Sequence, residues 1–185
     1  MSIKVLCIGD VMLDVVTKIS VMPSEINYGS DTSSRISTHG GGAAGNVASW
    51  LTRTNAQATI VGHVGNDAAG TALVAEFDAL GVRHNNLVVE SGQSGVVVVL
   101  VDPTGERTMF PDNGVNSGLN IGDLPDLSEF DAIYISGYSG IQSNIYKFTL
   151  DTSGTMPTLT SAITAAEMPT GERIFKIAYY LDFLA

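Results

Sequence analysis

The sequence opens with Ile3-Lys4-Val5-Leu6-Cys7-Ile8-Gly9-Asp10, a run of apolar and β-branched residues that ends in a glycine and an aspartate. A continuous apolar run of this length predicts a strand that is buried on both faces, as strands of a parallel sheet are. Residues that directly follow such a strand belong to its carboxyl end, where α/β proteins form binding sites. The opening stretch therefore predicts an α/β fold with a site near Asp10.

Further core elements follow in the order expected of an α/β protein. Apolar runs predict buried strands at residues 58–62 and 131–136. Apolar residues with helical spacing predict helices at 40–51 and 67–80. The inward face of the second helix is expected to carry Leu73, Val74, Phe77 and Leu80.

Short segments between these core elements predict a second, smaller sheet. Two segments lie within residues 15–38, and two within 95–111, where Asp102-Pro103-Thr104-Gly105 predicts the turn of a hairpin. Residues 96–101 are all apolar, whereas a hairpin with one face in water alternates between apolar and polar residues. Both faces are therefore expected to be covered, one by the site and one by a neighbour or a second subunit.

Composition limits the partners and the compartment. The chain has 185 residues with 9 Lys+Arg and 19 Asp+Glu, a formal net charge of −10, which argues against nucleic acid or an anionic membrane as partner. Its single cysteine, Cys7, cannot form an internal disulfide and is expected to be buried. The sequence contains neither a membrane span, which needs roughly 18 apolar residues, nor a secretion signal. A cytoplasmic protein is expected.

Gly40-Gly41-Gly42 opens an alanine-rich helix and is a second candidate for the site. With Gly45 it matches the G-x-G-x-x-G fingerprint of dinucleotide-binding proteins. In that fingerprint the glycines follow the first buried strand directly, whereas two short segments intervene here. A structural glycine turn is the other interpretation, but Asn46 and the unbonded N–H groups of the first helical turn favour a ligand site.

Asp10 and Asp14 follow the first strand closely and are both candidate substrate ligands. A carboxylate can accept two hydrogen bonds, which suits it to hold adjacent hydroxyl groups of a sugar. Two alternatives remain open: the two residues could be solvated turn residues, or they could hold Mg²⁺ or Ca²⁺.

The other titratable residues give weaker signals. His39, His63 and His84 lack the spacing of metal ligands and are interpreted as structural or surface residues. Arg107 lies on the predicted hairpin, which could carry it over the site, where a guanidinium can pair with phosphate. It is equally well explained as a surface residue beside Glu106.

Four motifs, taken together and in this order, resemble the ribokinase-like (PfkB-type) carbohydrate kinase family. The resemblance covers roughly residues 3 to 138 and matches the first half of the family's pattern. The motifs are IGDVMLD at 8–14, GGAAGNVA at 41–48, VGHVGNDAAG at 61–70, and GERT at 105–108 with GVN at 114–116.

The resemblance implies a ribokinase-like three-layer α/β core with a small β-sheet lid. It also implies phosphoryl transfer from ATP to a sugar or nucleoside hydroxyl, the use of Mg²⁺, and homodimers formed through the lid hairpin. Position by position, Asp14 would bind substrate hydroxyls, and Gly41, Gly42 and Asn46 would complete the pocket. Arg107 would lie on the lid.

The resemblance ends in the second half of the family's pattern. The family takes its general base from an Asp-Thr-x-Gly-Ala-Gly-Asp loop, and Asp151-Thr152-Ser153-Gly154 matches only its first four residues. No catalytic base can be named, and most of the ATP site is expected to be missing. Residues 1–140 are expected to form the substrate-binding half of a truncated core, and 141–185 a divergent tail with a helix near 174–184.

Three functional hypotheses follow. The first is a carbohydrate kinase-like protein whose shortened chain has little or no activity alone. The second is a non-catalytic module that binds a polyol or dimerises through the same lid. The third, a dinucleotide-binding oxidoreductase, rests on the glycine fingerprint alone.

Overall fold

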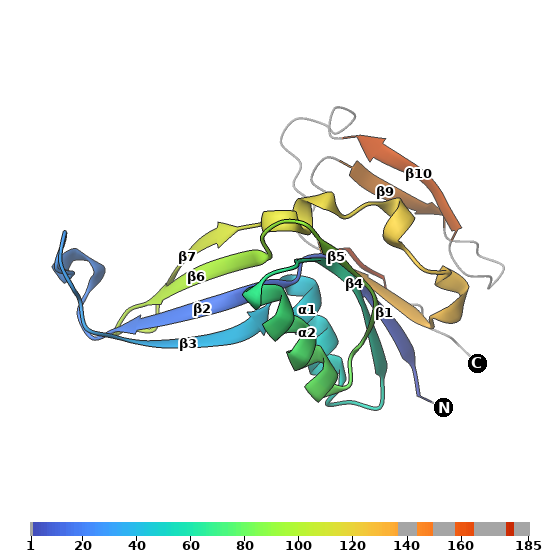
Figure 1. The fold of residues 1–185 in the computed structure, drawn as a ribbon. Coiled ribbons are helices and arrows are strands. Elements are labelled where there is room, and N and C mark those ends of the chain that lie inside the picture. Colours follow the sequence, from blue (N-terminus) through green and yellow to red (C-terminus); the bar gives the residue numbers. More distant parts are fainter. Residues whose placement is uncertain (1, 137–143, 150–157, 165–176, 180–185) are drawn as a thin grey trace.

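The main sheet of the computed structural model has the strand order β11-β8-β1-β4-β5 (Figure 1). The structure describes residues 2–136, 144–149, 158–164 and 177–179. The strands are β1 (Lys4–Ile8), β4 (Gln57–Gly65), β5 (Arg83–Glu90), β8 (Ala132–Ile135) and β11 (Ile177–Tyr179). The first four are parallel, and β11 runs antiparallel to β8.

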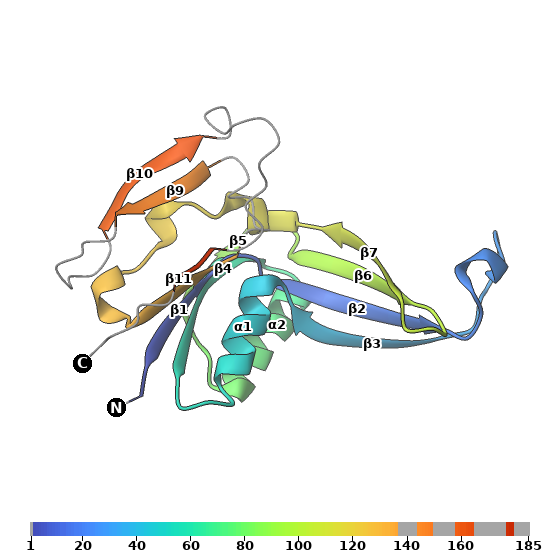
Figure 2. The same ribbon diagram turned by 180° about the vertical axis from the view of Figure 1, so that it is seen from behind.

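A second sheet, called the lid below, extends away from the main sheet in both views (Figures 1 and 2). Its strand order is β3-β2-β6-β7. The strands are β2 (Met12–Ile19), β3 (Ser34–Gly41), β6 (Gly95–Val101) and β7 (Arg107–Asp112), and a 3₁₀ turn η1 (Pro23–Glu25) lies between β2 and β3. β9 (Asn144–Thr149) and β10 (Thr158–Thr164) form a separate antiparallel pair.

Helices cover one face of the main sheet and short turns cover the other. α1 (Ala43–Leu51) and α2 (Ala68–Leu80) lie side by side on the first face (Figure 2). The opposite face is covered by η2 (Gly114–Gly118), η3 (Ile121–Asp123) and η4 (Leu127–Glu129). Because side chains alternate along a strand, β1 serves both layers. Cys7 packs with the helices, whereas Leu6 and Ile8 pack with residues such as Leu119 and Phe130.

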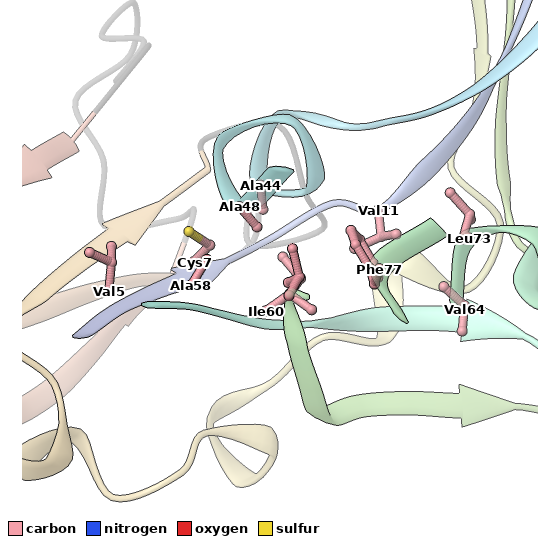
Figure 3. Packing of buried hydrophobic residues seen from close by; sticks show 11 residues of the cluster. Val5, Cys7, Val11, Ala44, Ala48, Ala58, Ile60, Val64, Leu73 and Phe77 are labelled. Atoms are coloured by element: carbon pink, nitrogen blue, oxygen red, sulfur yellow. The ribbon is translucent and has the colours of Figure 1, made fainter. Parts of the chain in front are cut away.

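The helix-side core is tightly packed around β1 and β4 (Figure 3). Cys7, Ala44 and Ile60 are completely buried, and Phe77 is nearly so. Burial raises the pKa of the Cys7 thiol to about 12, so the group is a neutral packing residue rather than a nucleophile. The prediction that Cys7 is buried is confirmed.

The α/β architecture with a small second sheet is confirmed, but three details of the prediction are wrong. Leu80 is 37% exposed and does not share the inward face of α2 with Leu73 and Phe77. Strand β5 was not predicted, because Arg83-His84-Asn85-Asn86 is too polar for a buried strand. Residues 177–179 form strand β11 rather than part of a helix.

Candidate functional site

The site is built where the lid meets the first helix. β2 and β3 pair in a register that sets Asp14 opposite His39 and Met12 opposite Gly41. The Asp14 carboxylate lies directly against Gly41, where a Cβ atom would overlap its oxygens. Only glycine fits at this position without moving Asp14, and the carboxylate is thereby held against a stretch of bare backbone.

The surroundings of Asp14 make its ionised form less favourable than it is in water. Partial burial raises the pKa of its carboxyl above the ordinary value of 3.8, and the negative charge of Asp10 acts in the same direction. His39 and Arg107 lower it, but burial has the larger effect. A ligand that donates hydrogen bonds in place of the water excluded by burial would stabilise this carboxylate.

Gly42 turns the chain from β3 into α1. It has φ +80°, a backbone conformation that favours glycine, and a Cβ there would overlap the Asp10 carbonyl. Its own carbonyl accepts a hydrogen bond from the Asn46 N–H at 2.9 Å, so Asn46 stands one helical turn further on, with an exposed side chain. Asp14, Gly41, Gly42 and Asn46 are therefore gathered at one corner of the molecule.

Asp10 is bound inside the protein. It is only 5% exposed, and its Oδ2 accepts a hydrogen bond from the Ala43 N–H at 2.8 Å. Its Oδ1 accepts one from the Ser136 hydroxyl, and its carbonyl accepts one from the Gly45 N–H at 3.3 Å. Two N–H groups of the first turn of α1, expected to be available to a ligand, are thus bound by Asp10. This residue fixes the helix to the end of β1.

Asn116 holds the connection between β1 and β2. Its Oδ1 accepts a hydrogen bond from the Val11 N–H at 2.9 Å, and its Nδ2 donates to the Val11 carbonyl at 2.9 Å and to the Asn113 carbonyl at 3.0 Å. The side chain is 2% exposed, and a Cβ at Gly95 would overlap its Nδ2. Val11 lies between Asp10 and Asp14, so Asn116 sets the path of the segment that carries both carboxylates.

Glu76 supports the triglycine from the other side. This α2 residue accepts a hydrogen bond from the Gly40 N–H through Oε2 at 2.8 Å. A Cβ at Gly40 would come within 2.8 Å of the same oxygen. The second helix therefore helps to place the backbone on which Asp14 rests.

The motif at residues 61–70 makes structural contacts through Asp67. Asp67 caps α2 by accepting the Gly70 N–H at 2.8 Å, and it also accepts the Ser94 hydroxyl at 2.6 Å and the Ser94 N–H at 2.9 Å. These hydrogen bonds, that from the Ser94 hydroxyl first, lower the pKa of the Asp67 carboxyl. The motif joins α2 to the start of the lid strand β6.

The histidines have different environments. His63 is 1% exposed, with Nε2 2.8 Å from Asp123 Oδ2 and Nδ1 3.1 Å from Glu90 Oε1, although the second contact lacks hydrogen-bond geometry. His84 contacts Asp78 at 2.8 Å on the surface. Neither approaches the site, whereas His39 directly faces Asp14 across the strand pair.

Arg107 is exposed at the start of β7, on the lid. The described residues include no group of three His, Cys, Asp or Glu side chains that could hold a metal ion. In the same part of the chain, no helix is long and apolar enough to cross a membrane. The partial loop match at 151–154 lies outside the described residues.

Several residues of the site were not assigned a role from sequence. Asn116 lies in a recognised motif, but its contact with Val11 spans 105 residues of chain. Ser136 contacts Asp10 across 126 residues. Only the position of His39 could have been inferred from the sequence, because pairing of the two neighbouring short segments in the right register sets it opposite Asp14.

Several known proteins with similar sequences are described as sugar kinases. The chain is 34% identical over 118 residues to an ATP-dependent ribose-1-phosphate kinase of Halopiger xanaduensis, covering 63% of this chain and 39% of that protein. It is 26% identical over 125 residues to a ribokinase of Schizosaccharomyces pombe, covering 64% and 39%. The chain thus spans about two fifths of the length of these relatives.

The fold is also that of solved ribokinases. A ribokinase structure from Giardia lamblia superposes with a TM-score of 0.64 at 22% identity, over 73% of this chain and 45% of that one. Its likeness establishes the ribokinase-like fold predicted from the four motifs. Residues 2–162 match the family described as pfkB family carbohydrate kinase. The chain therefore belongs to the pfkB family of carbohydrate kinases.

Proposed function

We propose that this chain binds a sugar or nucleoside at the corner between Asp14, Gly41, Gly42 and Asn46, as the substrate-binding half of an ATP-dependent carbohydrate kinase. The contact between the Asp14 carboxylate and Gly41 carries the proposal. It leaves a partly buried carboxylate beside bare backbone, an arrangement suited to adjacent hydroxyl groups.

In this proposal each residue has a separate task. Asp14 accepts hydrogen bonds from two sugar hydroxyls, and the exposed Asn46 amide offers both a donor and an acceptor. The absence of a side chain at Gly41 lets the Asp14 carboxylate lie against the backbone, and its absence at Gly42 lets the start of α1 lie close to the Asp10 carbonyl. Asp10 acts indirectly, since both of its oxygens already accept hydrogen bonds from Ala43 and Ser136.

Membership of the family implies ATP as phosphoryl donor and Mg²⁺ as its metal. When bound, this pair supplies the phosphoryl group and neutralises charge on it. The described residues offer no cluster of metal ligands, and the sequence matches only part of the family's anion-binding loop. No nucleotide or metal ligand is therefore assigned, and no residue is assigned as the base that would accept the proton of the sugar hydroxyl.

We propose further that residues 1–140 form this substrate-binding half and that 141–185 form a divergent tail, although the family match extends to residue 162. We also propose that the 185 residues alone transfer phosphate very slowly or not at all. The same observations favour a second candidate, a non-catalytic module that binds a polyol. The names of the relatives do not agree on the substrate, so the proposal stays at the level of sugar or nucleoside.

The lid is the proposed homodimer surface. On its face opposite Asp14, Ile36, Val98 and Phe110 are 65%, 41% and 57% exposed, which leaves apolar side chains of three strands in water. Burying them against a second copy would complete the cover expected for the apolar strand β6. Sedimentation at tens of micromolar tests this proposal, and a monomer at that concentration contradicts it.

We also propose that the protein is located in the cytoplasm.

Calorimetric titration of the full chain with ribose, other sugars and nucleosides, with and without ATP and Mg²⁺, tests the function. Sugar binding together with phosphorylated product identifies a kinase. Sugar binding without nucleotide binding or product identifies the non-catalytic module. Binding of NAD(H) and of no sugar would contradict both and would restore the oxidoreductase hypothesis.

A further inference from the structure

The lid carries an unusual row of positive charge on the face that holds Asp14. The strand registers set Lys18 opposite Arg35 on β3 and beside Val101 on β6, and they set Val101 opposite Arg107 on β7. Residues that pair across a sheet point to the same face. Arg35, Lys18 and Arg107, called the cation row below, therefore share one face of the lid.

This face is the one on which the proposed substrate lies. Side chains two and four residues apart along a strand point the same way, so Lys18 shares a face with Asp14. The two α-carbons are separated by four residues, or roughly 13 Å of extended strand. The long side chains of lysine and arginine can shorten that gap. Arg107 already acts on Asp14, because its charge lowers the pKa of that carboxyl against the larger effect of burial.

The charge on this face is opposite to that of the whole chain. The strands of the lid contribute three cations to it, the cation row, and one carboxylate, Asp14, for a balance of 3 − 1 = +2. The complete chain has a formal net charge of −10. Asp112, the other carboxylate in these strands, pairs with Val96 and so points to the opposite face.

No ion pair involves the cation row within the described part of the chain. Its three side chains are exposed, and the ion pairs found among the described residues all involve histidine. Lys18 and Arg35 are directly opposite one another, and like charges in that position repel. Lys18 and Arg107, by contrast, lie on either side of Val101 with their backbones roughly 10 Å apart, and their flexible side chains can converge on one anion between them.

We infer that the substrate of this site is a sugar that already carries a phosphate group, with its hydroxyls on Asp14 and its phosphate on Lys18 and Arg107, assisted by Arg35. This inference rests on the proposed function, because it extends the same site along the lid. A phosphate held by a lysine and an arginine forms charge-assisted hydrogen bonds. A neutral sugar of the same size would leave the cation row unused.

The test compares ribose, ribose 1-phosphate, ribose 5-phosphate and inorganic phosphate by calorimetric titration of the full chain. At least one phosphorylated pentose is expected to bind about tenfold or more tightly than ribose, a gain typical of a charge-assisted contact. In a Lys18→Gln, Arg107→Gln double variant that advantage should disappear, so that ribose and the phosphorylated pentose bind about equally. Arg83→Gln, which removes an exposed cation from β5, is the matched control and should change neither affinity.

Three results would overturn the inference. Ribose could bind as tightly as ribose 1-phosphate and ribose 5-phosphate. The tighter binding of a phosphorylated pentose could survive in the double variant. Inorganic phosphate alone could bind as tightly as the phosphorylated pentose. In each case ribose binding that depends on Asp14 would leave the proposed function intact. Failure of every sugar to bind, with or without phosphate, would contradict the proposed function together with this inference.

Discussion

The carboxylate of Asp14 fills the space that a side chain at Gly41 would need. The two residues come from adjacent strands of the lid, at the point where β3 gives way to α1. A binding carboxylate and the bare backbone beside it are thus fixed by one contact. Asp10, Glu76 and Asn116 hold the surrounding chain in place from the β1–β2 connection, α2 and η2.

Replacing Asp14 with asparagine separates binding from stability. Asp14→Asn keeps the shape of the side chain but removes the charge and one acceptor, so sugar affinity should fall at least tenfold. Because burial raises the pKa of this carboxyl, its ionised form is less favourable in the folded protein than in water. The free energy of unfolding near neutral pH should therefore stay equal or rise. Calorimetry and urea unfolding measure the two effects, and a large loss of stability would contradict this account.

Sugar binding should weaken with acid earlier than an ordinary aspartate predicts. Binding uses the ionised Asp14, and its pKa is raised above 3.8 by burial and by Asp10, with His39 and Arg107 opposing. A raised pKa means that the proton binds the folded protein more tightly than the unfolded chain, so protonation starts at a higher pH. Affinity measured as a function of pH should decline with a midpoint above 3.8. A flat profile down to that value would show that the charge on Asp14 is not used.

Gly41→Ala should disable the site, whereas Gly45→Ala should not. An added Cβ at Gly41 overlaps the Asp14 carboxylate and must displace it. At Gly45 the nearest atom, Phe77 Cζ, would lie at 3.7 Å, an ordinary contact, and alanine in a helix is favoured over glycine by roughly 0.5–1 kcal/mol. Sugar affinity and urea midpoints of the two variants give the comparison. Equal affinities would contradict the role of Gly41.

Asn116 and Gly95 should be energetically coupled. Asn116→Ala removes the partners of the buried Val11 N–H and carbonyl, at a cost of about 1–3 kcal/mol for each unsatisfied group. Gly95→Ala adds a Cβ that overlaps the Asn116 Nδ2. In the double variant that overlap is gone, although contacts of 3.1 Å with Asn113 and Met12 remain. The double variant should therefore lose less unfolding free energy than the sum of the losses in the two single variants. Strict additivity would show that the two residues do not meet.

Sequence alone predicted the elements whose pattern is local. The apolar run of β1, the helix that follows the triglycine and the hairpin of β6 and β7 all follow from periodicity and turn residues. β5 was missed because its first four residues are polar. A tertiary pairing with β4, not its own composition, makes that segment a strand.

The site was predicted less completely, for the same reason. Asp14 and the triglycine could be recognised as motifs, but the sequence does not show that Asp10 faces inward. Its partners, Ala43 and Ser136, lie 33 and 126 residues away along the chain. The cation row likewise depends on the register between strands, which places Arg107 in line with Lys18 through Val101.

The most direct test of the central claim is an NMR titration of the chain, labelled with ¹⁵N at its 20 glycines, with ribose and with ribose 5-phosphate. If a sugar lies against the backbone beside Asp14, the amide signals of Gly41 and Gly42 should shift on addition of at least one of the two. Those of Gly81 and Gly122, outside the site, should not move. The shifts should vanish in Asp14→Asn. Sugar-dependent shifts that leave Gly41 and Gly42 unchanged, or that persist without the carboxylate, would contradict the account.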